Sequence, residues 1–317
     1  MFFLLSAQDR GACGRTDWAS DMSFRRLLRY LPGMLALAPA VMVVLVVYLG
    51  CTIWSIGISM TASRILPGGR FVGLEQYYAL FSNERWQISI SNLAIFGVLF
   101  VITSIVLGFA LAIFLDQKIR GEDLLRSIYL YPYSMSFIVT GLVWQWMLTP
   151  GSGIEKVVHD LGFSSFRFDW IVDQTMVVYT LVLAAVWQAS GVVMAIALAG
   201  LRGIDAEIWK AIRIDGIPAW RAYPSIILPM MGGSIATCVV LLSISVVRLY
   251  DLVVAITKGG PGIASEVPAK FVIDYLFTRQ NIGLATAGTT VMLMTVLAVL
   301  APYAYLQSRR TQRDGTR

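Results

Sequence analysis

The chain alternates between long apolar stretches and shorter polar connections. Six stretches contain no Asp, Glu, Lys or Arg and are long enough to cross a bilayer. A spanning helix needs about 20 mostly apolar residues, and in hydrocarbon a single segment satisfies its own backbone only as a helix. The pattern predicts an all-α membrane protein with six transmembrane helices, lying within Tyr30–Ser63, Trp86–Leu115, Ser127–Ile154, Gln174–Leu201, Ala222–Val247 and Gln280–Ser308.

Positive charges orient these helices. Connections on the cytoplasmic side of a membrane carry an excess of Lys and Arg. The N-terminal segment, the second connection, the segment 202–229 and the tail together hold about twice as many of them as the other connections. The bias predicts a multi-pass protein with both termini and the segment 202–229 in the cytoplasm.

The same pattern sets the expected domain organisation: a cytoplasmic N-terminal segment 1–29, a six-helix transmembrane domain 30–308 with a cytoplasmic loop 202–229, and a basic cytoplasmic tail 309–317. The first 21 residues lack a charged region before the short FFLL run, so they do not have the pattern of a secretory signal. They are interpreted as a disordered or mis-assigned extension, which leaves Met1 and Met22 as alternative starts.

Composition agrees with a membrane protein. The 317 residues are 57% hydrophobic and 14% charged, whereas about a quarter of a soluble domain is charged. The net charge of +6 comes from basic residues that flank apolar stretches, which indicates membrane topology and no nucleic-acid partner. The three cysteines form no C-x-x-C motif, so neither a disulfide framework nor a metal site is expected.

The connections on the predicted external side are longer. RFVGLEQYYALF (70–81) and GIEKVVHDLGFSSFRFDW (153–170) have the pattern of short surface helices with buried aromatic side chains. TKGGPGIASEV (257–267) is a Gly-Pro turn cluster. These segments serve either connection and packing or contact with an external partner, and the pattern leaves both open.

The loop 202–229 contains EIWKAIRIDGIPAWRAYPSIILP (207–229), which divides into two helical halves. Asp205 is placed to cap the first half, and Gly216 to end it in a left-handed conformation. The polar side chains of the first half share one arc: Glu207, Lys210 and Arg213. The apolar ones share the opposite arc, with Trp209 at the border: Ile208, Ala211 and Ile212.

The second half continues the pattern. Pro218 suits the first turn of a helix, along which Trp220, Tyr223 and Ile226 recur at helical spacing. Such a helix–glycine–helix either rests on lipid headgroups or fits a groove in a partner protein.

This segment resembles the cytoplasmic loop of the inner-membrane permease subunits of ATP-binding-cassette (ABC) importers. That loop reads Glu-Ala-Ala, three residues, Gly, nine residues, Ile, one residue, Leu-Pro. Lys210-Ala211-Ile212 lies on the triplet, and Gly216, Ile226 and Leu228-Pro229 complete it with every spacing intact. Lys210 replaces the leading Glu and Ile212 the second Ala. Further stretches, FVGLEQYYALF, WQWMLTPGSGI and YDLVVAITKGGPG, are similar to the carbohydrate-uptake branch, the maltose-permease-like subunits; the first 21 residues are not covered.

The resemblance implies a type I importer (MetI-like) bundle whose loop forms a coupling helix. It implies as partners an ATP-binding subunit dimer, a second permease subunit, an extracytoplasmic sugar-binding protein and membrane lipid. The chain is then no enzyme and binds no cofactor, ATP and Mg²⁺ being held by the partner. The sugar implied is a glucose-type monosaccharide or an α-glucoside. The ATPase-coupling residues are Trp209, Lys210, Ala211, Ile212, Asp215, Gly216, Ile217, Pro218, Leu228 and Pro229.

A transported sugar needs hydrogen bonds and a stacking face within the bundle, and polar groups within spans tend to face a cavity. The candidate residues of such a path are Trp144, Gln145, Trp187, Gln188, Ser190, Arg248, Tyr250 and Asp251. Packing is the competing interpretation, because Trp is common at membrane interfaces and Gln and Ser bond between helices. Arg248 and Asp251, three apart on a helix, are either an ion pair or a gate.

Other function classes fit the sequence less well. An ion-coupled secondary transporter would carry carboxylates within its spans, and none of the six stretches contains one. His159 is the only histidine and lies in a predicted external loop, which argues against a Ser-His enzyme. No phosphate-loop motif is present, so ATP hydrolysis needs another polypeptide. A channel remains as an alternative, but a channel would not require the helix–glycine–helix segment.

Overall fold

The computed structural model describes residues 36–117, 119–163 and 165–314. These residues form helices, and the β contact among them is an isolated bridge between Thr61 and Phe71. The chain divides into two compact units, Met1–Gly57 and Ile58–Arg317. The predicted N-terminal segment 1–29 lies outside the described residues, as does the choice between Met1 and Met22.

The first unit contributes most of the first predicted span. A helix runs from Ala36 to Ser59 and is long and apolar enough to cross a membrane. Its middle is wound as a π-helix, η1 (Val44–Gly50), and α2 (Cys51–Ser59) follows.

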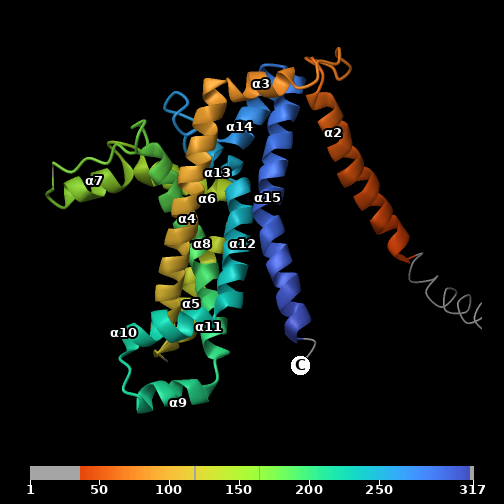
Figure 1. Cartoon of the computed structure of the whole chain (residues 1–317). Coiled ribbons are helices and arrows are strands. Elements are labelled where there is room, and N and C mark those ends of the chain that lie inside the picture. Colours follow the sequence, from red (N-terminus) through yellow and green to blue (C-terminus); the bar gives the residue numbers. More distant parts are fainter. Residues whose placement is uncertain (1–35, 118, 164, 315–317) are drawn as a thin grey trace, which may run out of the picture. The chain divides into compact units, whose positions relative to one another are not determined.

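Two long helices form the centre of the second unit. They are α4 (Glu84–Asp116) and α8 (Val177–Arg202), and both are long and apolar enough to cross a membrane. They pack along each other (Figure 1). Gly108 allows this approach, because a Cβ added to it would lie 2.5 Å from Cγ1 of Val193. The second and fourth predicted spans are these helices.

The fifth predicted span is bent. Its two arms are Ala219–Met230 and α12 (Gly232–Val247), and they meet at an angle of 75°. The first arm consists of three short pieces in succession: α10 (Ala219–Ala222), η3 (Tyr223–Ile227) and α11 (Leu228–Met230).

The third predicted span is interrupted, and its longest helix is short. Its residues are divided among α5 (Glu122–Leu130), the 3₁₀ turn η2 (Tyr131–Ser134) and α6 (Phe137–Leu148). Pro132 lies in the turn and has no N–H to donate. Ser136 then starts a new helix, since its hydroxyl accepts from the Val139 N–H at 3.2 Å.

The C-terminal part completes the bundle. It comprises α13 (Tyr250–Ile256), which packs against α6, then α14 (Pro268–Ile273), the π-helix η4 (Asp274–Thr278) and α15 (Ile282–Asp314). Within the described residues, three helices meet the length and hydropathy expected of a span, or four if the bent pair is one span. The count of six therefore stays a prediction.

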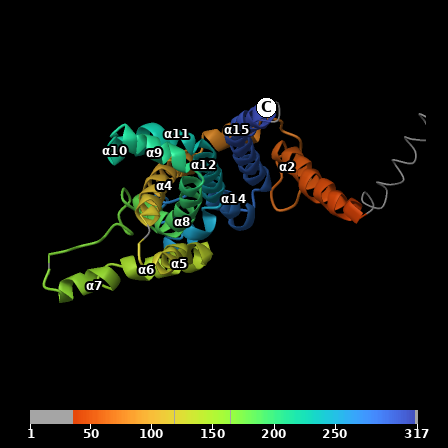
Figure 2. The ribbon, with the colours of Figure 1, turned by 90° about the horizontal axis from the view of Figure 1, so that it is seen from below.

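Two short surface helices occur where the sequence predicts them: α3 (Glu75–Phe81) and α7 (Gly153–Asp160). The prediction that their aromatic side chains are buried holds in part for Tyr77, which packs against a core cluster, but not for the most exposed ones. Tyr78 is 74% exposed, and Phe163, just beyond α7, is 66% exposed. Seen from below, α7 projects away from the long helices, so little of its own chain is there to cover it (Figure 2).

Burial is concentrated in two clusters. The larger surrounds α8 and includes Phe96 and Phe100, whose rings stack at 5.3 Å. The smaller lies near the start of α4, where Trp86, Phe271 and Tyr275 pack together. These two clusters position the polar groups described next.

Candidate functional site

The loop 202–229 forms a helix, a tight turn and a second helix at the lower end of the view in Figure 1. Its first helix is α9 (Ala206–Ile214). Asp205 caps it as predicted, because its side chain accepts from the Glu207 N–H at 3.0 Å. Gly216 has a φ of +64° and turns the chain in the left-handed region, also as predicted. We refer to residues 202–229 as the helix–glycine–helix loop.

One side of this loop is anchored to the bundle. Ile212 is buried, and Ile208 and Ile217 pack against the larger core cluster. The rings of Trp209 and Tyr223 meet edge to face at 5.8 Å, joining the two helices of the loop. The anchor is therefore apolar and comes from both halves.

The other side of the loop has no cover from the described chain. Ile214 is 85% exposed and Trp220 is 70% exposed. The guanidinium of Arg221 lies 4.7 Å from the centre of the Trp220 ring. Large apolar side chains held this far out of a core are a common feature of protein-binding surfaces.

Some residues of the loop lie differently from the prediction. Ala211 is exposed although it was assigned to the apolar arc, and Trp220 does not share a buried face with Tyr223. Pro218 is the residue before α10 and not its first turn. The remaining residues predicted to couple to an ATPase are also exposed: Lys210, Asp215, Leu228 and Pro229.

An ion cluster joins the base of the loop to the long helices, and the sequence analysis missed it. Arg202, at the end of α8, donates to Glu122 of α5 at 2.6 Å and lies 3.7 Å from Asp116 of α4. The three residues are far apart in the sequence and show no common motif. They tie the start of the loop to two other helix ends.

A second candidate site lies between α6 and α8. The rings of Trp144 and Trp187 meet edge to face at 5.9 Å. Beside Trp187, Gln188 is buried and donates to the carbonyl of Met135 at 2.7 Å. The structure thus brings together residues from two predicted spans.

This second site has unused hydrogen-bonding groups. The Oε1 of Gln188 and the Nε1–H of Trp144 are buried, and neither has a partner among the described residues. A buried polar atom without a partner is costly, so these two atoms offer one acceptor and one donor to a ligand with hydroxyl groups. Ser190 bonds within its own helix to the carbonyl of Trp187 at 3.3 Å, and Gln145 is half-buried.

Of the two alternatives for Arg248 and Asp251, an ion pair or a gate, the described residues do not show the ion pair. Both side chains are exposed, and no ion pair joins them in the described part of the chain. The prediction assumed one continuous helix, but α12 ends at Val247 and α13 begins at Tyr250. The break removes the helical spacing on which the pair depended.

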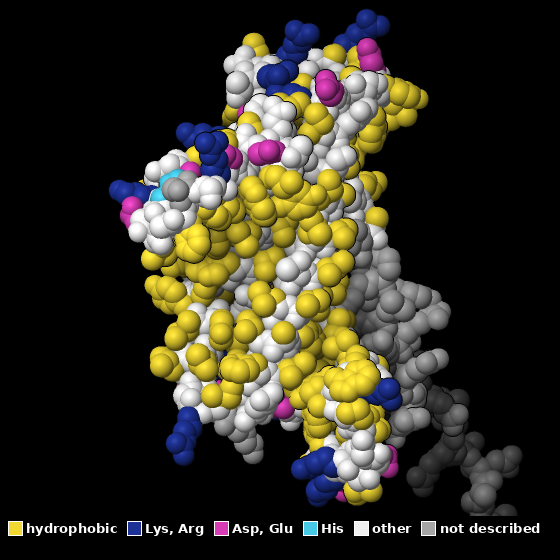
Figure 3. All heavy atoms as spheres, turned by 90° about the vertical axis from the view of Figure 1, so that its left-hand side faces the viewer, with side chains coloured by type: hydrophobic (Ala, Val, Ile, Leu, Met, Phe, Trp, Pro, Cys, Tyr) yellow, Lys and Arg dark blue, Asp and Glu magenta, His cyan; other side chains and the backbone are white. Residues whose placement is uncertain are grey.

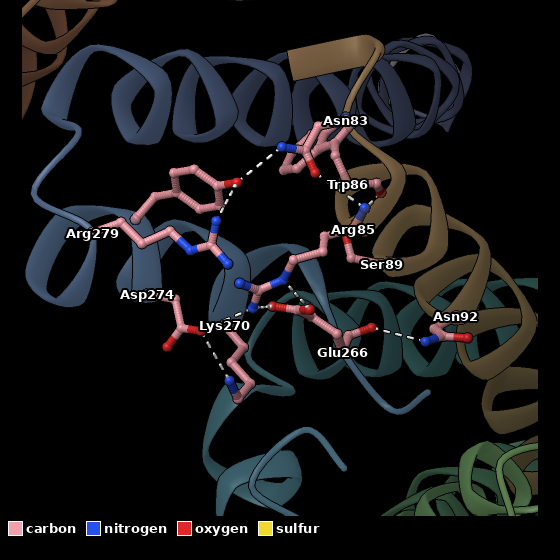
Figure 4. A network of polar contacts seen from close by, with 10 residues as sticks. Asn83, Arg85, Trp86, Ser89, Asn92, Glu266, Lys270, Asp274 and Arg279 are labelled. Atoms are coloured by element: carbon pink, nitrogen blue, oxygen red, sulfur yellow. Dashed lines mark hydrogen bonds and ion pairs between the residues drawn. The ribbon is translucent and has the colours of Figure 1, made fainter. Parts of the chain in front are cut away.

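The other end of the second unit holds a polar network that the sequence analysis did not identify (Figure 4). Arg85, in the first turn of α4, donates through both Nε and Nη2 to the carboxylate of Glu266, with Nε at 2.8 Å from Oε2. Nη2 also donates to Asp274 at 2.9 Å. The Glu266 side chain is 1% exposed. Asn92 donates to the Glu266 carbonyl at 2.9 Å, which fixes the backbone of the same residue.

The charges of this network act on Asp274. Burial tends to raise the pKa of its carboxyl group, but the hydrogen bond from Arg85 and the proximity of Lys270 outweigh burial. Its pKa is therefore held below the ordinary value. Among the described residues no cluster of His, Cys, Asp and Glu has the arrangement of a metal site.

Comparison with known proteins agrees with this geometry. A family model described as the binding-protein-dependent transport system inner membrane component matches residues 104–312. The chain is 34% identical to a probable ABC transporter permease protein of Pyrococcus horikoshii over 282 residues, which cover 88% of this chain and 97% of that protein. It is 31% identical to the xylose/arabinose import permease protein XacH of Haloferax volcanii, over 86% of both.

A further relative is the trehalose/maltose transport system permease protein MalF of Thermococcus litoralis, which is 27% identical over 89% of this chain and 95% of that protein. Among solved structures, the fold is similar to that of a bacterial ABC transporter involved in the import of the acidic polysaccharide alginate. The TM-score is 0.77 at 15% identity, covering 91% of this chain and 99% of that one. This likeness concerns the fold.

Proposed function

Since the chain belongs to the family of binding-protein-dependent transport system inner membrane components, we propose that it is a permease subunit of an ATP-driven sugar importer. In this proposal it forms part of the sugar path and couples that path to a separate ATPase subunit. The observation that carries the proposal is the helix–glycine–helix loop, anchored by Ile212 on one side and projecting Ile214 and Trp220 on the other.

The exposed side of the loop is proposed to dock in a cleft of the ATP-binding subunit. A helix that carries apolar side chains into a groove gains affinity from their burial, while its charges set register. Because Lys210 is exposed where the family pattern has a carboxylate, its counterpart on the ATPase is expected to be acidic or neutral. ATP and Mg²⁺ are proposed to bind that partner, and the loop and both termini are proposed to lie in the cytoplasm.

The sugar is proposed to pass the site between α6 and α8. The faces of Trp144 and Trp187 suit the apolar face of a sugar ring, and Gln188 Oε1 and Trp144 Nε1 suit its hydroxyl groups. A glucose-type monosaccharide or an α-glucoside is the proposed substrate. The relative named for trehalose and maltose supports this choice, although the relative named for xylose and arabinose is more similar in sequence.

The proposal includes two further partners. A second permease subunit would complete the path, and an extracytoplasmic binding protein would deliver the sugar. The support is the family description, which names binding-protein dependence, and a solved structure of similar fold described as in complex with an alginate-bound periplasmic protein.

The coupling role is tested by Ile214→Asp. Because this side chain is 85% exposed, the variant is expected to fold normally but to bury an unpaired charge at the ATPase cleft. We expect co-purification of the ATPase subunit and sugar-stimulated ATP hydrolysis both to fall at least about tenfold. The matched control is Ile65→Asp, at a position 69% exposed and outside the loop. Equal behaviour of the two variants, or sugar transport in vesicles without any ATPase, would contradict the proposal.

The sugar path is tested by Trp144→Phe, which removes the indole N–H and keeps an aromatic ring. We expect the KM for uptake to rise about tenfold, as for a lost hydrogen bond to substrate, with assembly unchanged. Trp86 offers a matched control, because its Nε1–H is also buried without a partner but lies in the smaller cluster. An unchanged KM for Trp144→Phe, or an equal rise for Trp86→Phe, would place the path elsewhere.

A further inference from the structure

The short helix α7 divides cleanly into two arcs. At 100° per residue, one arc holds its apolar side chains and that of the next residue: Ile154, Val157, Val158 and Leu161. The opposite arc holds its polar ones: Glu155, Lys156, His159 and Asp160. This is the division expected of a helix that lies along a boundary between apolar and polar surroundings.

The burial of side chains in α7 does not follow their polarity. On the apolar arc, Val157 is 60% exposed and Leu161 is 73% exposed. On the polar arc, Glu155 is buried and accepts from the Gly151 N–H at 3.1 Å. His159 Nε2 lies 2.6 Å from the carbonyl oxygen of Phe166. One edge of the apolar arc, at Val157 and Leu161, therefore faces away from the protein, while Ile154 and Val158 on the same arc are half-buried.

The segment after α7 extends the same exposed apolar surface. Phe163 is 66% exposed and Val172 is 56% exposed. Phe168 and Trp170 stack at 5.0 Å, with Trp170 41% exposed. Arg167 lies between these aromatic residues in the sequence and is also exposed. Aromatic and basic residues mixed in this way are enriched where a membrane protein meets the headgroup region.

The neighbouring surface indicates which medium contacts the exposed apolar side chains of α7. Hydrophobic side chains cover the flank of the long helices in a broad band, and charged side chains gather above the band on the projecting part (Figure 3). The helix α4, long and apolar enough to cross a membrane, contributes exposed apolar residues such as Ile102 and Val106. The hydrophobic band reaches the projecting part (Figure 3), so one medium is expected to cover both.

We propose that α7 and the described residues after it, 161–163 and 165–172, form an interfacial membrane anchor. The apolar arc inserts at the boundary between acyl chains and headgroups, at the end of the bundle away from the helix–glycine–helix loop. Arg167 extends its charged end toward headgroup phosphates while its aliphatic stem stays in the apolar layer, and Lys156, on the opposite arc, faces the headgroups and water. The anchor fixes the depth of α6, whose 12 residues span only about 18 Å and leave the hydrocarbon core early.

The proposal is tested by spin labels on the two arcs of α7. In a chain with serine in place of Cys13, Cys51 and Cys238, single cysteines are introduced as Val157→Cys and Leu161→Cys, with Lys156→Cys and Asp160→Cys as matched controls. All four labelled positions are exposed, so labelling leaves the packing intact. The labelled chain, with its co-purifying partners, is reconstituted in vesicles of phosphatidylcholine with a minor share of phosphatidylglycerol.

Collision with oxygen, which concentrates in the bilayer, is then compared with collision with a water-soluble nickel complex. We expect oxygen to dominate at 157 and 161 and the nickel complex to dominate at 156 and 160, each by severalfold. Nickel access at all four positions would show that α7 lies in water. Protection of 157 and 161 from both reagents would show that a protein partner covers this surface. Either result would overturn the proposal.

Discussion

The two ends of the second unit are built on opposite principles. At one end, α9 of the helix–glycine–helix loop has a single buried side chain, Ile212, and leaves large apolar groups such as Ile214 uncovered. At the other end, Arg85 is held by two carboxylates, and Glu266 is almost fully buried. The loop end exposes an apolar surface, and the network end holds together segments that are far apart in the sequence.

This difference shows where the fold tolerates movement. Removing one partner of a buried, hydrogen-bonded ion pair strongly destabilises the fold. Segments joined by such a pair are therefore expected to move together. A helix with few buried contacts opens at low cost. The network end is therefore expected to act as a fixed frame, and the loop end as the part that responds to a partner.

The largest expected effect comes from breaking the network end. Glu266→Ala leaves the Arg85 guanidinium with Asp274 alone, and removal of one partner of a buried pair costs about 3–5 kcal/mol. We expect a clear fall in the midpoint of thermal unfolding in detergent, followed by circular dichroism. Asp274→Ala is the comparison variant, because the Asp274 side chain is 32% exposed and its loss should cost less. Equal shifts for the two variants would mean that burial of Glu266 is not what holds this end.

A smaller effect is expected at the loop end. Gly216→Ala forces a side chain into the left-handed region, at a cost of about 1–2 kcal/mol. Because α9 has so little buried surface, the strain is expected to be relieved locally. Amide hydrogen exchange in α9 should accelerate about fivefold or more, while exchange near Glu266 stays unchanged. If exchange rises at both ends, the two ends form one cooperative unit.

The smallest effect concerns pH. The pKa of Asp274 is lower in the folded chain than in an unfolded one, so its ionised form stabilises the fold. That contribution is complete above the ordinary carboxyl pKa of about 4 and is lost as the pH falls through the lower folded value. We expect the unfolding midpoint of the wild type to fall more steeply than that of Asp274→Asn between neutral pH and about pH 3. Parallel curves would contradict the assigned cause.

The sequence predicted those features of the loop that depend on nearby residues. The cap at Asp205 and the left-handed turn at Gly216 each need only a few neighbours, so their residue types predict their geometry. The long helices α4 and α8 were also predicted, because a continuous apolar segment in lipid satisfies its backbone hydrogen bonds only as a helix.

Contacts between residues far apart in the sequence were not predicted. Arg85 and Glu266 are separated by 181 positions, and nothing in the turn cluster around Glu266 indicates its partner. The interruptions of helices were also missed: a proline at 132 divides the third predicted span, and the break before Tyr250 separates Arg248 from Asp251. In the candidate sugar path, the residue types were predicted, but their pairing across α6 and α8 required the fold.

The 75° bend between α11 and α12 has a mechanical consequence. When two helical arms meet nearly at right angles, a force along one arm acts mainly across the other. A push along the axis of the α10–α11 arm has little component along α12, so it arrives at Gly232 mainly as a sideways displacement. A partner that shifts the loop along that arm would therefore swing the end of α12 across the bundle and would hardly slide it along its own length.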